Sequence, residues 1–459
     1  MLMEKNLTGG SVFKNIVYFS LPYLLSYFLQ TLYGMADLFI IGQFEKSVAE
    51  TTAVSIGSQV MHMLTVMIVG LAMGTTVCIG QAVGSGNKRR AAQDIGNTAT
   101  LFMLVSAALT ALLLLLVRPI VGLVSAPQEA VSDTVKYLTI CFIGIPFITA
   151  YNVLSSVFRG MGDSKSPMYF IAVACAANIG LDYLFIGALK MGPAGAALGT
   201  TLSQAISVLI SFAAIAKRKL ISVEKNDFKP KKSVMEKILR IGVPVALQDG
   251  FIQVAFVFVT IIANRRGLTD SAAVGIVEKI IGFLFLVPSS LLSTVSAIGA
   301  QNIGAGKRDR AKLTLKYSCI ISVCYGAVIA LLVQFFAESL VSLFVNDAAV
   351  AASGGEYLRG YVWDVFFAGI QFSFSGYFCA CGKSQLSFLH NFISMLTVRI
   401  PGAYLMSKRF VSTLLPMGLA SAAGSLLSSI ICVIAFCVLE RRTAAKKEET
   451  NYGKAVQNR

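Results

Sequence analysis

The sequence predicts an all-α polytopic membrane protein with twelve transmembrane helices in two six-helix bundles related by a pseudo-twofold axis. Three observations lead to this prediction: an apolar composition, long apolar segments with basic charge on one side, and an internal repeat. Hydrophobic residues make up 56% of the 459 residues and charged residues only 14%, against roughly 25% charged residues in soluble domains. So few charges cannot shield so much apolar surface from water, which excludes a soluble enzyme, a nucleic-acid-binding module and a secreted disulfide scaffold.

Twelve segments are predicted to be spans, because a helix needs about 20 mostly apolar residues to cross the hydrocarbon core. Hydropathy places them near 15–41, 52–79, 95–117, 135–158, 167–189, 194–216, 238–264, 272–299, 314–337, 355–380, 385–407 and 413–439. The chain is therefore expected to divide into an N-lobe (1–216), a basic linker (217–237), a C-lobe (238–439) and a charged, disordered tail (440–459).

Basic residues give the orientation of these spans. Because the number of spans is even, both termini are expected on one side of the membrane. That side holds 28 of the Lys and Arg residues, whereas the opposite loops hold seven and the spans hold four. This is the positive-inside pattern, so we expect the termini, the linker and the tail to be cytoplasmic. The membrane is expected to be the inner membrane of a bacterial-type cell. The net charge of +16 then reflects topology and contact with anionic membrane lipids, and not nucleic-acid binding.

The two halves of the chain repeat each other. Residues 80–91 read GQAVGSGNKRRA and residues 300–311 read AQNIGAGKRDRA, so that Gln81 matches Gln301 and Gly84 matches Gly304 at an offset of 220. Six spans precede the basic linker and six follow it, so both halves enter the membrane in the same direction. Parallel repeats of this kind are typical of secondary transporters, in which two facing bundles form a cleft that opens to either side.

Polar residues inside the first six spans share helix faces at spacings of three or four. They are Gln30, Tyr33 and Asp37 in the first span, Asn178 and Asp182 in the fifth, and Thr200 and Gln204 in the sixth. Such residues can simply tie helices together by hydrogen bonds, but carboxylates within spans usually face a cavity and carry function. No Lys or Arg lies deep in these spans, and two neighbouring carboxylates without a cation share a proton or bind an ion. The first half therefore predicts a coupling site for H⁺ or Na⁺.

Several motifs together resemble those of the multidrug and toxic compound extrusion (MATE) family, over essentially the whole chain except the tail. They are GMADLFIIGQF (34–44), the two repeated loops, FRGMGDSKSP (158–167) and NIGLDYLFIGALKMGPAGAALGT (178–200). The DinF-like branch is the one implied, and this resemblance implies a cation-coupling site made of Asp37, Asn178, Asp182 and Thr200. It also implies an N-lobe substrate cavity lined by Tyr33, Tyr137 and Asn152, to which we add Gln30 and Gln204 from their spacing, and a bend of the first helix at Pro22.

The NorM-like branch of that family has a Glu eight residues after the proline of its seventh helix. Here Ile252 stands eight residues after Pro244, so we do not expect a C-lobe cation site of that kind. The C-lobe keeps other intramembrane charges, namely Asp249, Glu278, Lys279, Arg359, Asp364 and Arg399. We interpret them as a structural polar network, with a second coupling or substrate site as the alternative.

The expected function is export of small amphipathic or cationic organic compounds by a monomer, in antiport with H⁺ or Na⁺. No cofactor is expected, and no metal other than Na⁺. A flippase for lipid-linked or other amphipathic substrates is the alternative, but such cavities typically hold a pyrophosphate with several cationic residues, which the first six spans lack. An enzyme is not expected, because the sequence contains no HExxH, no GxSxG and no Cys–His pairing.

The predicted orientation can be tested by cysteine labelling. Cysteines introduced at 88–90, 225–232 and 307–310 should react with a membrane-impermeant reagent only from the cytoplasmic side, because all three segments lie in basic loops of that side. Labelling of any one of them from outside intact cells would contradict the twelve-span topology.

Overall fold

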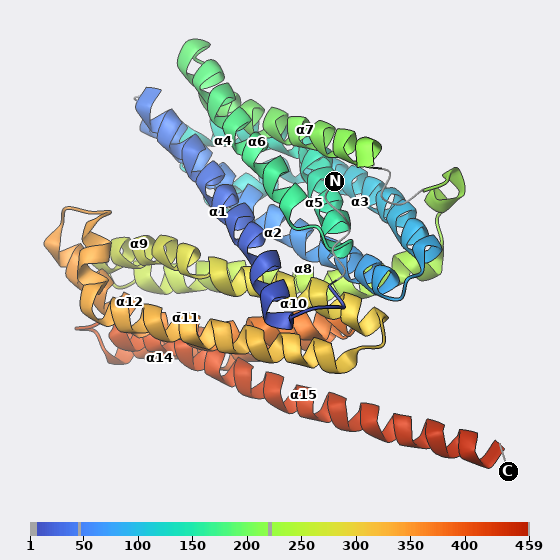
Figure 1. The fold of residues 1–459 in the computed structure, drawn as a ribbon. Coiled ribbons are helices and arrows are strands. Elements are labelled where there is room, and N and C mark those ends of the chain that lie inside the picture. The colour runs from blue at the N-terminus through green and yellow to red at the C-terminus, as the bar shows by residue number, and fades with distance from the viewer. Residues whose placement is uncertain (1–6, 45–46, 219–222, 458–459) are drawn as a thin grey trace. The chain divides into compact units, whose positions relative to one another are not determined.

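Helices form almost all of the protein (Figure 1). The structure, a computed structural model, describes residues 7–44, 47–218 and 223–457, and these contain no β-strand. The first half forms α1 (Val12–Phe44), α2 (Val48–Gly84), α3 (Lys88–Leu123), α4 (Gln128–Ile143), α5 (Ile145–Gly160), α6 (Lys165–Asp182), a π-helical turn η1 (Tyr183–Ala188), α7 (Gly192–Arg218) and a 3-10 turn η2 (Lys225–Phe228). The second half forms α8 (Lys232–Asn264), α9 (Leu268–Leu284), α10 (Leu286–Gly304), α11 (Arg308–Ser342), α12 (Ala348–Ala380), α13 (Ser384–Ser394), a π-helical turn η3 (Met395–Arg399), α14 (Ile400–Arg409) and α15 (Leu415–Gln457).

Every predicted span coincides with a helix or with a bent or interrupted helix, so the all-helical, multi-pass fold class is confirmed. Within the described ranges, nine helices are long and apolar enough to span a membrane, and the pair α4–α5 makes a tenth with a bend of 47°. The bend lies at Gly144, next to Pro146, which lacks the amide that would continue α4. The other two predicted spans, α12 and α13–η3–α14, are helical but are not among the helices that pass this test of length and apolar character.

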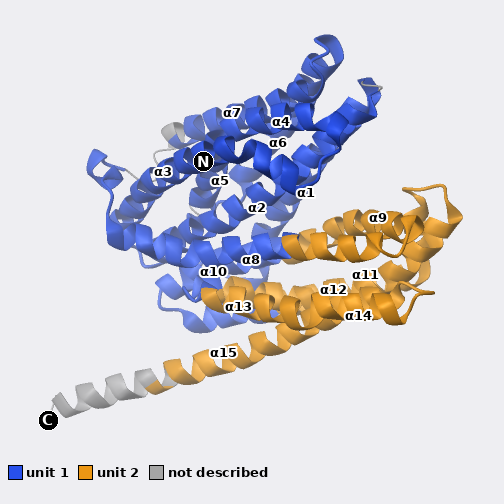
Figure 2. Ribbon diagram, turned by 180° about the vertical axis from the view of Figure 1, so that it is seen from behind, with its two compact units in different colours: residues 1–253, 289–317, 379–384 blue, residues 254–288, 318–378, 385–459 orange. Residues whose placement is uncertain are grey.

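Contacts divide the chain into two compact units, coloured in Figure 2. Unit 1 comprises residues 1–253, 289–317 and 379–384, and unit 2 comprises residues 254–288, 318–378 and 385–459. The compact units are therefore not the same divisions as the two halves of the repeat. Segments of the second half around Gln301 and Ala380 pack with the first half, and the lobe boundaries drawn from the sequence stay a prediction.

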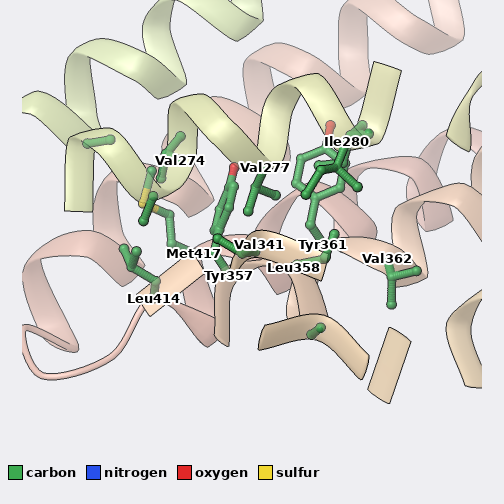
Figure 3. Packing of buried hydrophobic residues seen from close by; sticks show 14 of the residues in the cluster. Val274, Val277, Ile280, Val341, Tyr357, Leu358, Tyr361, Val362, Leu414 and Met417 are labelled. Atoms are coloured by element: carbon green, nitrogen blue, oxygen red, sulfur yellow. The ribbon is translucent and has the colours of Figure 1, made fainter. Parts of the chain in front are cut away.

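Each unit has its own apolar core. In unit 2, Val274, Val277 and Ile280 of α9 pack against aromatic and aliphatic side chains of α12, including Tyr357 and Tyr361 (Figure 3). In unit 1, one cluster joins α1, α2, α4 and α7, and a second joins α2, α5, α6 and α7. Outside these cores large apolar side chains are exposed, as expected for helices that face lipid.

The linker between the halves is packed against α3. The Asp227 side chain is buried, and its Oδ2 accepts hydrogen bonds from Arg89 Nη1 and from the Glu224 amide, both at 2.9 Å. Asn97 Nδ2 donates to the Asp227 carbonyl at 3.0 Å, and Asn97 Oδ1 accepts from the Lys231 amide at 2.7 Å. The described part of the linker is therefore anchored to the first half through both backbone and side chains.

The last helix extends beyond the predicted end of its span. Helix α15 begins at Leu415 and continues to Gln457, whereas the span was predicted to end near 439, and the disorder expected of the tail stays a prediction. The segment ERRTAAKKEE (440–449) consists almost entirely of Ala, Glu, Lys and Arg, which have high helix propensities. Hydropathy identifies where a span ends, but it does not identify a helix that continues in polar residues.

Arg266 joins two loops of unit 2, and its replacement tests how much one cation contributes to that junction. Its guanidinium donates to Asp270 Oδ2 at 2.7 Å and to the carbonyls of Ser407, Phe410, Val411 and Thr413 at 2.6–3.3 Å. Because lysine cannot reproduce this planar set of donors, Arg266→Lys should lower the free energy of unfolding by about 2 kcal/mol. Thermal unfolding in detergent measures the effect, and Arg265→Lys at the exposed neighbouring position should leave the midpoint unchanged.

Candidate functional site

Two carboxylates lie buried in unit 1 on helices that pack together. Asp37 is on α1, which contacts α6, and Asp182 is the last residue of α6, which contacts α7. Asp37 is 2% exposed, and both Asp182 and Asn178, one turn earlier on α6, are 0% exposed. Directly after Asp182 the helix changes to the π-helical turn η1, a local change that is often found at functional sites.

Thr200 on α7 links this pair to the third helix. Its hydroxyl donates a hydrogen bond to Asp37 Oδ2 at 2.9 Å. The Tyr33 hydroxyl, one turn before Asp37, donates to the Thr200 carbonyl at 3.0 Å and lies 3.1 Å from Ser203 Oγ. The side chains of Asp182 and Asn178 interact with Asp37. The structure thus brings together all four residues predicted to form the coupling site.

The site has more hydrogen-bond acceptors than donors. Asp37 Oδ1, both carboxylate oxygens of Asp182 and both polar atoms of Asn178 are buried without a hydrogen bond of ordinary geometry. In the described part of the chain no Lys or Arg pairs with either carboxylate. A shared proton, or a cation coordinated by oxygens, supplies what such a pair lacks. No group of three or more His, Cys, Asp or Glu residues that could hold a metal ion occurs among the residues described.

Glycine 199 of α7 makes room for the second carboxylate. A Cβ at this position would lie 2.1 Å from Asp182 Oδ1 and 3.3 Å from its Cγ. The carboxylate therefore lies directly against the backbone of α7, one residue before Thr200. Any side chain larger than hydrogen at position 199 must displace it.

The predicted substrate-cavity residues divide into two groups. Tyr137 is buried close enough to interact electrostatically with Asp37, and Gln204 interacts with Tyr33, so both belong to the cluster. Asn152 is buried on α5, where its Nδ2 donates to the Ile148 carbonyl at 2.8 Å within the same helix. Gln30 is partly exposed on α1. No hydrogen bond joins Asn152 or Gln30 to the cluster in the residues described.

Sequence reasoning missed two members of the cluster. Ser203 contacts the Tyr33 hydroxyl, and Cys141 interacts with both Tyr137 and Asp37. Each follows a predicted residue at helical spacing, since Ser203 is three residues after Thr200 and Cys141 is four after Tyr137. The same spacing rule that grouped Asn178 with Asp182 would therefore have found them.

Pro22 lies inside α1, which is uninterrupted from Val12 to Phe44. The Ser26 hydroxyl donates to the Pro22 carbonyl at 2.8 Å, one turn along the helix. The bend expected at Pro22 stays a prediction.

The intramembrane charges of unit 2 form a smaller network than expected. Arg399 donates to Asp364 Oδ2 at 2.7 Å and to the Tyr361 hydroxyl, and it interacts with Glu278, which accepts a hydrogen bond from Thr260 at 3.1 Å. Three of the predicted members lie elsewhere. Asp249 is on the part of α8 that belongs to unit 1. Lys279 is exposed, and Arg359 exchanges backbone and side-chain hydrogen bonds with Gln334.

Comparisons with known proteins found relatives that match over most of this chain. The MatE family profile matches residues 22–184 and 244–405. The probable multidrug resistance protein YpnP of Bacillus subtilis is 30% identical over 400 residues, which cover 87% of this chain and 89% of YpnP. The probable multidrug resistance protein NorM of Thermotoga maritima is 27% identical over 435 residues, 92% of each chain. A solved structure described as the outward-facing conformation of a multidrug resistance MATE family transporter has the same fold, with a TM-score of 0.88 at 21% identity over 96% of this chain and 98% of that chain.

The position of Gly199 gives a test of the site that removes no polar group. Gly199→Ala should displace the Asp182 carboxylate at a cost of about 1–3 kcal/mol, which corresponds to roughly a 5- to 150-fold loss in affinity for the coupling ion. The measurement is the H⁺ or Na⁺ concentration that gives half-maximal transport. Gly180→Ala is the matched control, because a Cβ at that position on α6 has nothing within 4 Å. Equal behaviour of the two variants would contradict this description of the site.

Proposed function

The chain belongs to the MATE family of multi-pass membrane transporters, and from this premise we propose that it exports small amphipathic or cationic organic compounds in exchange for H⁺ or Na⁺ by alternating access. It is a transporter and not an enzyme. The names of its relatives, which include multidrug resistance and multidrug export proteins, support the substrate class. A monomer in the inner membrane of a bacterial-type cell, with both termini cytoplasmic, is part of the proposal.

One observation carries the choice of a cation antiporter: Asp37 and Asp182 are buried side by side with no basic partner in the described chain. Two ionised carboxylates that are buried side by side repel each other and have lost their hydration. Binding one cation, either a proton or Na⁺, relieves both costs. The affinity for the cation therefore depends on how close α1, α6 and α7 hold these groups.

Substrate and cation then compete through the same helices. In the outward-open state, cation binding lets Asp37 and Asp182 approach each other, and the accompanying shift of α1 against α6 and α7 expels the substrate. Tyr33, Gln204 and Tyr137 lie next to the pair and transmit the change to the substrate cavity. A single charge that moves through 100 mV contributes about 2.3 kcal/mol, or roughly a fifty-fold concentration gradient of substrate.

The flippase alternative is not favoured. The site is built from carboxylates, amides and hydroxyls, and these groups bind cations and not a pyrophosphate. A transporter of anionic lipid precursors needs cationic side chains at the place where this chain has Asp37 and Asp182.

The function is tested by efflux of ethidium or norfloxacin from cells and by transport in proteoliposomes, with the proton and Na⁺ gradients imposed separately. We expect transport with at least one of the two gradients. Asp37→Asn and Asp182→Asn should each reduce it to the background of empty vesicles while the protein is still produced, because an amide cannot alternate between a charged and a neutral form. Wild-type transport by both variants would refute the proposed coupling site.

The pH dependence separates the two units. If protons couple transport, substrate should bind more tightly at pH 8.5 than at pH 5.5, since protonation of Asp37 and Asp182 favours substrate release. Asp37→Asn and Asp182→Asn should make this profile flat, whereas Glu278→Gln should keep it. Titration of substrate fluorescence between these pH values measures the effect, and a flat profile in Glu278→Gln instead would move the coupling site to unit 2.

A further inference from the structure

The two copies of the repeated loop motif meet in unit 1, where α2 crosses α10. A Cβ on Gly84 would lie 1.9 Å from the Gln301 carbonyl oxygen, and a Cβ on Gly304 would lie 2.1 Å from the Gln81 carbonyl oxygen. Each glycine thus lies against the backbone at the equivalent glutamine of the other half. The crossing is reciprocal and consists of backbone in contact with backbone.

The glutamine side chains continue this symmetry. Gln81 Nε2 donates to the Ala380 carbonyl at 2.9 Å, and Gln301 Nε2 donates to the Gly160 carbonyl at 3.0 Å. Ala380 and Gly160 are the last residues of α12 and α5, and they are separated by 220 positions, as are the two glutamines. Each half therefore uses the same glutamine to bond the same helix end of the other half.

One feature breaks the symmetry. Lys237 Nζ on α8 donates to Gln81 Oε1 at 2.8 Å, so the Gln81 amide is bonded at both its oxygen and its nitrogen. No cation bonds Gln301 in the part of the chain that the structure describes. A hydrogen bond from a charged donor contributes more free energy than one from a neutral donor. The contacts of Gln81 are therefore stronger than those of Gln301.

We propose that Gln81, Gln301, Gly84 and Gly304 form a reciprocal lock that holds the two halves together at the end of α2 and α10, and that this lock must open in each transport cycle. The proposal rests on the alternating-access function proposed above. The lock lies next to the loops 85–87 and 305–307, on the side predicted to be cytoplasmic. Substrate cannot enter from that side while α2 and α5 of the first half are bonded to α10 and α12 of the second.

The chemistry of the lock suits repeated opening. A crossing at two glycines places backbone in contact but interdigitates few apolar side chains, so separation exposes little apolar surface. The side-chain bonds join neutral amides to carbonyls at helix ends, which can bond water once they separate. Each such bond contributes only a modest net free energy, in contrast to a buried ion pair. Gln81 and Gln301 are therefore positioning residues that set the balance between closed and open states.

A buried thiol reports opening directly. None of the nine native cysteines forms a disulfide, so they can be replaced, and a single Ala300→Cys then places a thiol at the crossing. Ala300 is fully buried, and its Cβ lies 3.1 Å from the position of a Cβ on Gly80. N-ethylmaleimide should modify this thiol only when the crossing opens, so the rate of modification measures the open fraction.

Loss of one neutral hydrogen bond should raise that rate about five-fold in Gln301→Leu, with a larger rise in Gln81→Leu, where Lys237 also loses its acceptor. Lys237→Met should give a smaller rise than Gln81→Leu. Gln128→Leu, at an exposed position at the start of α4, should leave the rate unchanged. Parent-like rates in both glutamine variants would overturn the proposal.

A cross-link provides the second measurement, which does not depend on how well the glutamine variants fold. Gly80→Cys combined with Ala300→Cys brings two Cβ atoms to about the separation of a disulfide, after a shift of a few tenths of an ångström. Oxidation should stop ethidium efflux, and a reductant should restore it. Undiminished efflux by the fully oxidised protein would overturn the lock. The measurement of thiol modification needs no substrate and therefore tests the lock by itself. If the cysteine-free parent protein fails to transport, that result counts against the proposed export function and not against the lock.

Discussion

The absence of a basic partner for two buried carboxylates, within the described chain, is the constraint on which the rest of the first half depends. An acid pair of this kind is tolerable only when the surrounding helices supply a hydroxyl, amides and room for an extra positive charge. Thr200 provides the hydroxyl, Asn178 the amide and Gly199 the room. Three helices must therefore keep a fixed rotation relative to one another, and a change in the charge of the pair acts on all three.

Much of the fold was predictable, because hydropathy depends on composition over about twenty residues and not on packing. All twelve predicted spans coincide with helices. Helical spacing grouped Asn178 with Asp182, and the family resemblance implied a site that adds Asp37 and Thr200; these four residues lie together in the structure. Two kinds of feature were not predictable. The surroundings of Lys279 and Arg359 depend on how each helix is rotated, and the π-helical turns depend on how neighbouring helices pack against the backbone.

The two halves differ in the charges that lie near their π-helical turns. The fifth and eleventh predicted spans each contain a π-helical turn, the first beginning directly after Asp182 and the second ending at Arg399. Asp182, beside the first turn, has no basic partner in the described residues. Arg399, at the end of the second turn, is paired with Asp364. A π-helical turn thus lies beside a group that can change its charge in one half and beside an ion pair in the other. A duplication that kept both copies alike would have two coupling sites or none.

The crossing of α2 and α10 also has an evolutionary consequence. When two side chains touch, a larger residue on one side can be compensated by a smaller residue on the other, and such positions drift together through a lineage. At Gly84 and Gly304 the atom that a new side chain would strike is a carbonyl oxygen of the main chain, which no codon change can shrink. Neither position has a compensating partner, so the gene is held at glycine in both copies. After the duplication the two halves were free to diverge in charge and in helix ends, but this crossing kept them interlocked at the same two codons.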